Sequence, residues 1–179
     1  MNTNEIDPNT EASGAAMIAV LNCARGEQLR PIMDNHGLRN VQPDEWYPIS
    51  LWMSVIEAIT QAHMGAYDLI AIGKEIARNI VLSDDVTTVE QAIIHLPEVY
   101  QHNYRKGNVG HYEVQKIKNG HLKVYGYIPF PGDLTLGVLR GLVKRYSQKG
   151  KHYTVTIDQT DGANASADSD HFTFDVKWW

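Results

Sequence analysis

Residues 111–130 read HYEVQKIKNGHLKVYGYIPF, and apolar and polar side chains alternate on both sides of Asn119-Gly120. A period of two residues is that of a β-strand, in which successive side chains point to opposite faces of a sheet. Asn-Gly is the pair that two-residue hairpin turns favour most, because these turns need positive φ angles. The segment therefore predicts two antiparallel strands that meet at this turn.

A helix and a second pair of strands are expected after the hairpin. In residues 131–150 the apolar residues return to a helical spacing. Residues 152–160 and 171–179 alternate again, and the Gly, Asn, Asp and Ser residues of 161–170 predict a flexible surface loop between them. The second half of the chain therefore predicts a β-β-α-β-β order and a four-stranded antiparallel sheet.

The first half predicts a helical layer, because apolar residues recur at helical spacing in about five segments. These segments are residues 15–24, 27–35, 42–65, 66–82 and 89–104. Pro31 and Pro48 fit only the first turns of their helices, and Gly73 marks a close crossing with a neighbour. Thr87 or Thr88 caps the last helix, which carries Tyr100, His102 and Tyr104.

The domain organisation follows from these patterns. Residues 1–13 are polar and predict a flexible tail, with Ser13 as an N-cap. Residues 14–179 predict a single α+β domain with a helical part (14–106) and a sheet part (107–179).

Composition excludes several classes of partner. A net charge of -5 without any run of Lys and Arg gives no attraction for nucleic acid. No apolar run approaches the ~20 residues that span a bilayer, and the polar N-terminus does not resemble a secretory signal. Cys23 is the only cysteine, which excludes an intramolecular disulfide and is typical of a cytoplasmic protein.

Motifs of catalysis and metal binding are missing. The sequence holds no nucleophile elbow, phosphate-binding loop or dinucleotide fingerprint, so it predicts a non-catalytic protein. None of its eight histidines belongs to a His-x-x-x-His or His-Glu-x-x-His pair, so it predicts no metal site.

Aromatic side chains are the remaining candidates for a binding site. Tyrosine supplies both the apolar wall and the polar group that orient a small ligand. The candidate pocket residues are Trp52, Tyr100, Tyr104, Tyr125, Tyr127 and Phe130. The same rings can instead fill the space between helices and sheet as a solid core.

The stretch LPEVYQHNYRKG (96–107), the hairpin, GDLTLGVLRGLVKRY (132–146) and the final strand pair resemble the distal end of the haem-NO/oxygen-binding (H-NOX) domain. The related 4-vinyl reductase domain shares this ending. Together with YPISLWMSVIEAIT (47–60), the pattern is most similar to an uncharacterised myxobacterial family that ends in Trp. The resemblance covers roughly residues 46–179 and implies a bacterial ligand-binding sensor.

The resemblance also indicates where a haem would be held. The family's proximal histidine follows a Leu-x-Glu-Val step, and here Leu96-Pro97-Glu98-Val99 leads into Tyr100. The family's Tyr-x-Ser-x-Arg clamp for the haem propionates falls on residues 125–129, where Tyr127 replaces the Ser and Pro129 replaces the Arg. Tyrosine must lose a proton with a pKa of ~10 to bind iron, and proline donates nothing to a propionate. These replacements predict a chain without haem or any other cofactor.

The function expected from the resemblance is that of a non-catalytic sensory or regulatory domain. It would bind a small apolar ligand between helices and sheet and signal through a protein partner or self-association, with Trp178 and Trp179 as candidate contacts. One alternative is a structural or assembly protein without a ligand. Another is a haem or tetrapyrrole gas sensor with Tyr100 or His102 as the axial ligand, although His102 lies about 200° round the helix from Tyr100.

Overall fold

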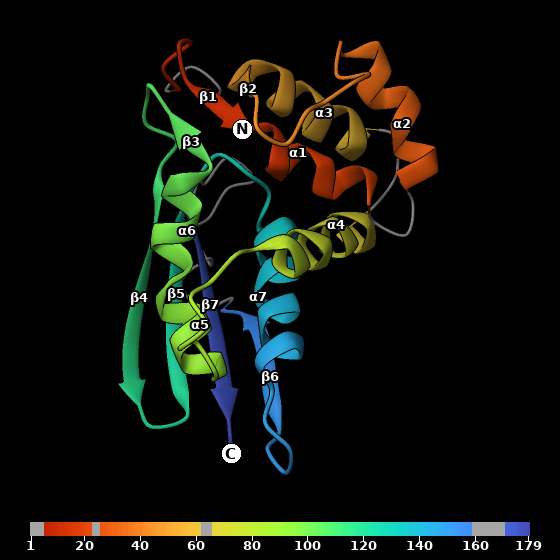
Figure 1. The fold of residues 1–179 in the computed structure, drawn as a ribbon. Helices are drawn as coiled ribbons and strands as arrows, with labels where there is room; N and C mark the ends of the chain where they lie inside the picture. The colour runs from red at the N-terminus through yellow and green to blue at the C-terminus, as the bar shows by residue number, and fades with distance from the viewer. Residues whose placement is uncertain (1–5, 23–25, 62–65, 159–170) are drawn as a thin grey trace.

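The computed structural model describes residues 6–22, 26–61, 66–158 and 171–179, and Figure 1 shows their arrangement. The strands are β1 (Glu11–Ser13), β2 (Trp46–Pro48), β3 (Tyr104–Arg105), β4 (His111–Lys118), β5 (His121–Tyr127), β6 (Tyr153–Ile157) and β7 (His171–Trp178). The helices are α1 (Gly14–Leu21), α2 (Gly26–Asn35), α3 (Ile49–Gln61), α4 (Ala66–Asn79), α5 (Val89–Ile94), α6 (Leu96–His102) and α7 (Gly132–Tyr146). The predicted α+β class is confirmed.

The larger sheet has the strand order β4-β5-β7-β6, and every neighbouring pair is antiparallel. Its two hairpins are bridged by α7, which confirms the predicted β-β-α-β-β order. At the first turn Gly120 has φ +81°, whereas Asn119 does not have a positive φ, and the pairing register shifts between Lys116 and Lys118. The hairpin therefore turns with a bulge rather than with two left-handed residues.

A second, smaller sheet corrects the prediction of a flexible tail through residue 13. Its order is β2-β1-β3, and its central strand β1 is formed by Glu11–Ser13, the last three residues of that tail. Ala12 in β1 is fully buried, and the carboxylate of Glu11 pairs with Arg105 and Lys106 at the end of β3. The hydroxyl of Ser13 accepts a hydrogen bond from the backbone N–H of Ala16, as expected of an N-cap.

The helical layer follows the predicted segments with different boundaries. In the segment 42–65 the sequence predicts Pro48 in the first turn of the helix, but Pro48 ends β2 and α3 begins at the next residue, Ile49. The helix expected to reach Tyr104 ends at His102, and Tyr104 pairs with β1 as part of β3. Pro31 lies inside α2 rather than in its first turn.

Thr88 is the residue that caps α5. Its hydroxyl accepts a hydrogen bond from the backbone N–H of Gln91, whose side chain accepts one in return from the backbone N–H of Thr88. This reciprocal pair satisfies two backbone donors that a helix start leaves free, so α5 begins at a fixed point.

Helix α4 crosses α7 at unusually short range, as Gly73 predicts. A Cβ atom on Gly73 would lie 2.2 Å from the carbonyl oxygen of Leu134, and one on Gly137 would lie 2.3 Å from that of Ile70. Only glycine allows the two backbones to approach so closely. Beyond the crossing, the guanidinium of Arg145 donates to the carbonyl of Ile80 at 2.6 Å, just past the end of α4.

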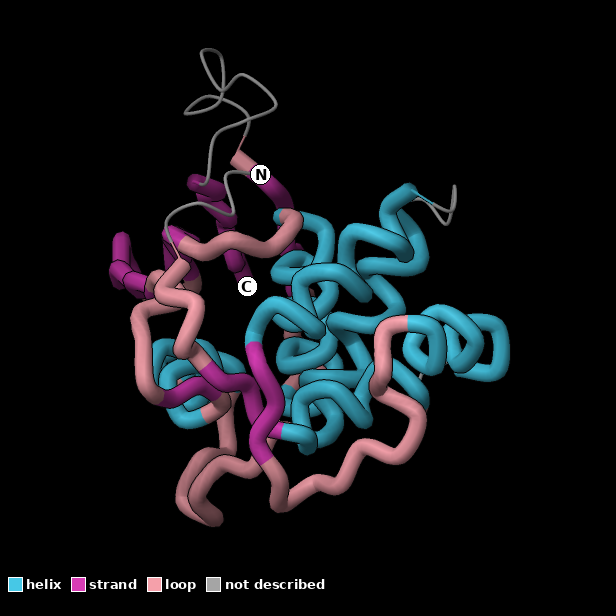
Figure 2. Tube along the Cα trace, turned by 90° about the horizontal axis from the view of Figure 1, so that it is seen from above, coloured by secondary structure: helices cyan, strands magenta, loops and turns pink. Residues whose placement is uncertain are grey.

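The two faces of the four-stranded sheet have opposite character. Helices α5, α6 and α7 cover the inner face, where Leu122, Val124, Phe174 and Val176 are completely buried. Seen from above, most helical residues lie to one side of the strands (Figure 2). The outer face carries polar side chains, so alternation along each strand divides core from surface.

One prediction concerns residues beyond those that the structure describes, namely the loop 161–170. Within the described residues, no helix is both long enough and apolar enough to cross a membrane.

Candidate functional site

Four aromatic rings meet between the helices and the inner face of the sheet. The ring of Tyr100 on α6 lies 4.9 Å from that of Tyr104 on β3 and 5.0 Å from that of Tyr112 on β4. Phe130, which follows β5, stacks on Tyr104 at 6.1 Å. Such edge and offset contacts stabilise a packed cluster beyond the area that it buries.

The hydroxyl groups of this cluster are paired inside the protein. Tyr100 donates to the carbonyl of Val109 at 2.7 Å, and the hydroxyl of Tyr112 lies 2.8 Å from that of Thr135 on α7. Burial raises the pKa of Tyr100, Tyr104 and Tyr112 well above the usual value for a phenol, because the charged form would lose its hydration. All three therefore stay neutral at physiological pH.

Little free space remains around these rings. The tyrosine cavity, as we name this space, has a volume of about 70 Å³. It is lined by Ala16, Trp52, Ile76, Ile80, Leu96, Val99, Tyr100, Asn103, Tyr104, Tyr112, Ile128, Phe130, Leu134, Thr135 and Val138. Pockets that enclose an organic ligand measure roughly 300–1,000 Å³, so the rings nearly fill this one.

The structure brings together four of the six predicted pocket residues. Trp52, Tyr100, Tyr104 and Phe130 all line the tyrosine cavity. Tyr125 and Tyr127 do not, because on β5 they alternate with Leu122 and Val124 and therefore lie on the outer face of the sheet. The prediction that these two share the pocket is wrong.

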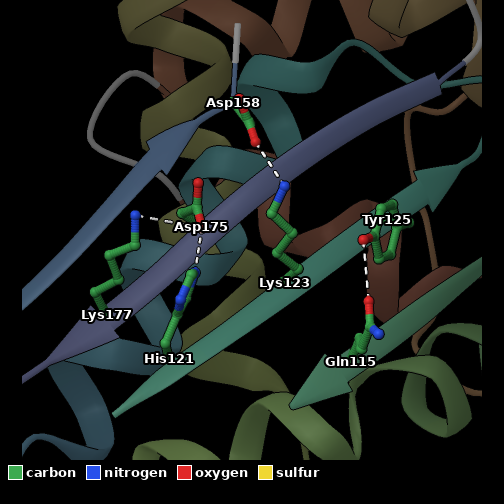
Figure 3. Close-up of polar contacts among 7 residues, drawn as sticks. All are labelled: Gln115, His121, Lys123, Tyr125, Asp158, Asp175 and Lys177. Atoms are coloured by element: carbon green, nitrogen blue, oxygen red, sulfur yellow. Dashed lines mark hydrogen bonds and ion pairs between the residues drawn. The ribbon is translucent and has the colours of Figure 1, made fainter. Parts of the chain in front are cut away.

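The outer face holds Tyr125 within a polar surface (Figure 3). The hydroxyl of Tyr125 donates to Gln115 at 3.2 Å. Beside it, Asp175 contacts both His121 and Lys177. Tyr125 pairs with Gln115, and His121 with Asp175, across neighbouring strands, as polar residues on the solvent face of an antiparallel sheet do, whereas Lys177 lies on the same strand as Asp175.

Tyr127 occupies one end of the same face. Its ring lies 5.0 Å from the ring of His111 and 4.9 Å from that of His171. The three side chains come from β4, β5 and β7 and follow the register of the sheet. They therefore form a row of rings on the outer face, remote from the tyrosine cavity.

A larger open space lies next to the tyrosine cavity, between α1, the end of α4 and the outer side of α6. This helical groove, as we name it, has a volume of about 580 Å³. It is lined by Ala15, Ala16, Ile76, Asn79, Ile80, Val81, Leu82, Ser83, His95, Glu98, Val99, His102 and Asn103. Ala16, Ile76, Ile80, Val99 and Asn103 also line the tyrosine cavity, so the two spaces are separated by a single layer of side chains.

The polar side of the groove is one face of α6. His95, Glu98 and His102 are spaced by three and four residues, which places them above one another on a helix. Nδ1 of His95 lies 3.5 Å from the Glu98 carboxylate, and Nδ1 of His102 lies 2.8 Å from the Glu98 carbonyl oxygen. The sequence prediction did not include these three residues. Their spacing of three and four residues, beside a helix with Pro97 in its first turn, could have indicated that they share one face.

The alternative haem ligands point to different spaces. Tyr100 lines the tyrosine cavity and His102 lines the helical groove, as their angular separation on α6 requires. Among the described residues, no three or more His, Cys, Asp and Glu side chains gather where they could hold a metal ion.

An iron porphyrin does not fit the tyrosine cavity in this form. The space is too small by several-fold, and the neutral Tyr100 hydroxyl already donates to a carbonyl. A propionate needs a cationic partner, yet no Lys or Arg is among the residues that line either space.

Comparison with solved structures finds the same fold in H-NOX proteins. An H-NOX protein from S. oneidensis in the Fe(II)NO ligation state is 13% identical with a TM-score of 0.67, covering 93% of this chain and 99% of that one. A mutant H-NOX of T. tengcongensis is 10% identical with a TM-score of 0.64, covering 91% and 94%. An unliganded Fe(II) H-NOX mutant from K. algicida is 9% identical with a TM-score of 0.65, covering 93% and 96%.

No protein-family model and no curated protein sequence matches this chain. The structural agreement nevertheless extends over nearly its whole length and includes both the helical layer and the sheet. The chain therefore has the H-NOX fold.

Proposed function

We propose that this chain is a regulatory ligand-binding domain that works without haem and binds a small, mostly apolar molecule in the helical groove. One observation carries the proposal. At Tyr100, where the resemblance places the iron ligand, packed and hydrogen-bonded tyrosine rings leave a cavity of about 70 Å³. The helical groove, one layer of side chains away, has a volume of about 580 Å³. The binding site thus lies on the helical side of α6 rather than against the sheet.

The walls of the groove support an apolar ligand. Ile76, Ile80, Leu82 and Val99 contribute aliphatic side chains, and Val81 at the rim is 88% exposed. Removing aliphatic surface of this kind from water is favourable. A ligand seated in the groove would bury part of this surface.

Signalling through a partner is the second part of the proposal. Helix α4 contributes walls to both spaces and crosses α7 at its glycines, so a change in the groove reaches the core of the domain through one element. Trp179 is 67% exposed beside His152 and is our candidate for the contact with another chain. Trp178 is partly buried against the core and is not free for that role. We place the domain in the cytoplasm.

The test uses 1-octanol as a neutral apolar probe and thermal unfolding as the readout. Octanol is expected to raise the midpoint of the wild-type chain, because a ligand that binds only the folded state stabilises it. Ala15→Phe, which fills the groove from α1, should abolish this rise, and Thr60→Phe on the exposed side of α3 should keep it. If octanol does not raise the midpoint of the wild-type chain, the proposal fails and the alternative of a structural or assembly protein without a ligand remains.

Haemin titration tests the absence of haem separately. The purified protein is expected to lack a Soret band and to leave the haemin spectrum unchanged. A stoichiometric shift of that spectrum would contradict the haem-free part of the proposal, and its loss in Tyr100→Phe or His102→Ala would identify the ligand.

A further inference from the structure

We infer that the helical groove selects ligands by their hydrogen-bond donors, and that it favours a protonated amine on an apolar body over a carboxylate. This inference rests on the proposed function, and it adds the chemical class of the ligand. It follows from which polar atoms of the groove are already committed to the protein and which are left over.

Three donor groups of the groove each make one hydrogen bond inside the protein. Nδ1 of His102 contacts the Glu98 carbonyl at 2.8 Å, and because a carbonyl only accepts, this nitrogen carries the proton. The amide nitrogen of Asn103 donates to the carbonyl of Val99, and that of Asn79 donates to the carbonyl of Glu75, each at 2.9 Å. The His102 imidazole therefore has no donor left, whereas each of the two amides keeps one further N–H.

The acceptors of the groove are left over. In the tautomer that Glu98 fixes, Nε2 of His102 carries a lone pair, and within the described part of the chain it has no hydrogen-bond partner. The side-chain oxygen of Asn79 likewise has no hydrogen-bond partner among the described residues. The Glu98 carboxylate has only the imidazole of His95 beside it, at 3.5 Å. A ligand that brings donors can satisfy these three acceptor groups, whereas an acceptor finds only the second N–H of each amide.

Charge acts in the same direction. Glu98 is the one side chain with a permanent charge among the residues that line the groove. It attracts an ammonium group and repels a carboxylate. The Glu98 side chain is 67% exposed, so solvent weakens both effects, and the expected discrimination is about tenfold rather than a thousandfold.

The experiment compares three probes with the same eight-carbon chain: octylamine, 1-octanol and octanoate. Titration calorimetry is run at pH 8, where an alkyl amine is protonated and an ordinary imidazole is neutral. The wild-type chain is expected to bind octylamine about tenfold more tightly than octanoate, with octanol between them.

Two variants and one control test which atoms cause the preference for octylamine over octanoate. Glu98→Gln should reduce the ratio to about twofold and leave octanol unchanged. His102→Phe should weaken octylamine about threefold and leave octanoate unchanged, because it removes an acceptor. Glu113→Gln on β4 is the matched control, since it makes the same change in net charge outside the groove and should keep the full ratio.

The outcomes separate the inference from the proposed function. Octanol binding with equal affinities for octylamine and octanoate would overturn the inference and keep the function. A ratio that collapses equally in Glu113→Gln would also overturn it, because the overall charge of -5 would then set the preference. If none of the probes binds, the proposed function itself fails.

Discussion

The tyrosine cavity and the helical groove share a wall of α4 and α6 side chains and differ in almost everything else. The cavity has about 70 Å³ of free volume and paired hydroxyl groups, and the groove has about 580 Å³ and unpaired acceptors. Paired, buried groups stabilise a fold, whereas open space and unpaired acceptors are what a ligand needs. The proposed function therefore assigns stability and ligand binding to two adjacent spaces of one fold.

The largest expected effect is on the cavity side. Tyr100→Ala should lower the free energy of unfolding by about 3–5 kcal/mol, because it removes a buried ring and its hydrogen bond to Val109. Val81→Ala on the rim of the groove should change it by less than about 0.5 kcal/mol. Urea denaturation measures both, and similar losses in the two variants would erase the contrast between the spaces.

A smaller effect is expected at the crossing that holds α4 against α7. Gly137→Ala should cost about 1–3 kcal/mol, because its Cβ meets the Ile70 carbonyl oxygen and the backbones must separate. In Gly141→Ala the new atom instead meets the Ala77 side chain at 2.5 Å, so Ala77→Gly should restore part of the loss. Urea denaturation of the single and double variants measures these changes in the free energy of unfolding. An unchanged free energy in Gly137→Ala would show that the two backbones can separate there without cost.

The smallest expected effect is a dependence on alkaline pH. The pKa of Tyr100 is raised in the folded state, so its stabilisation is complete below the unfolded value of ~10 and is lost as the pH rises through the folded value. At pH 10.5 the loss should be about 0.8 kcal/mol for this residue. Tyr100→Phe should show a correspondingly shallower decline in stability between pH 9 and 10.5 than the wild type, and Val81→Ala should show the same decline as the wild type.

Local signals in the sequence predicted much of the fold. The turn at Gly120, the close crossing at Gly73 and the cap at Thr88 each depend on the chemistry of one or two residues, and each is present. The strand β1 was not predictable in this way. Its three residues gain their hydrogen bonds from β2 and β3, which lie far away in the sequence, and Tyr104 leaves the helix for the same pairing.

The candidate site was predictable only in part. Trp52, Tyr100 and Phe130 were expected to converge, and they do. Tyr125 and Tyr127 were grouped with them because they are aromatic, although alternation with Leu122 and Val124 already places them on the other face. The free acceptors of the groove could not be foreseen, since they depend on which carbonyl each side chain reaches.

The contact between Arg145 and the Ile80 carbonyl has a practical consequence for building a biosensor. It fixes one end of the segment Val81–Thr87, and the reciprocal cap at Thr88 fixes the other. Between these anchors the chain runs along the rim of the groove with Val81 in solvent. A fluorescent protein grafted between Leu82 and Ser83 would sit between these two anchors, and, if the groove binds a ligand as proposed, its emission is expected to change with occupancy.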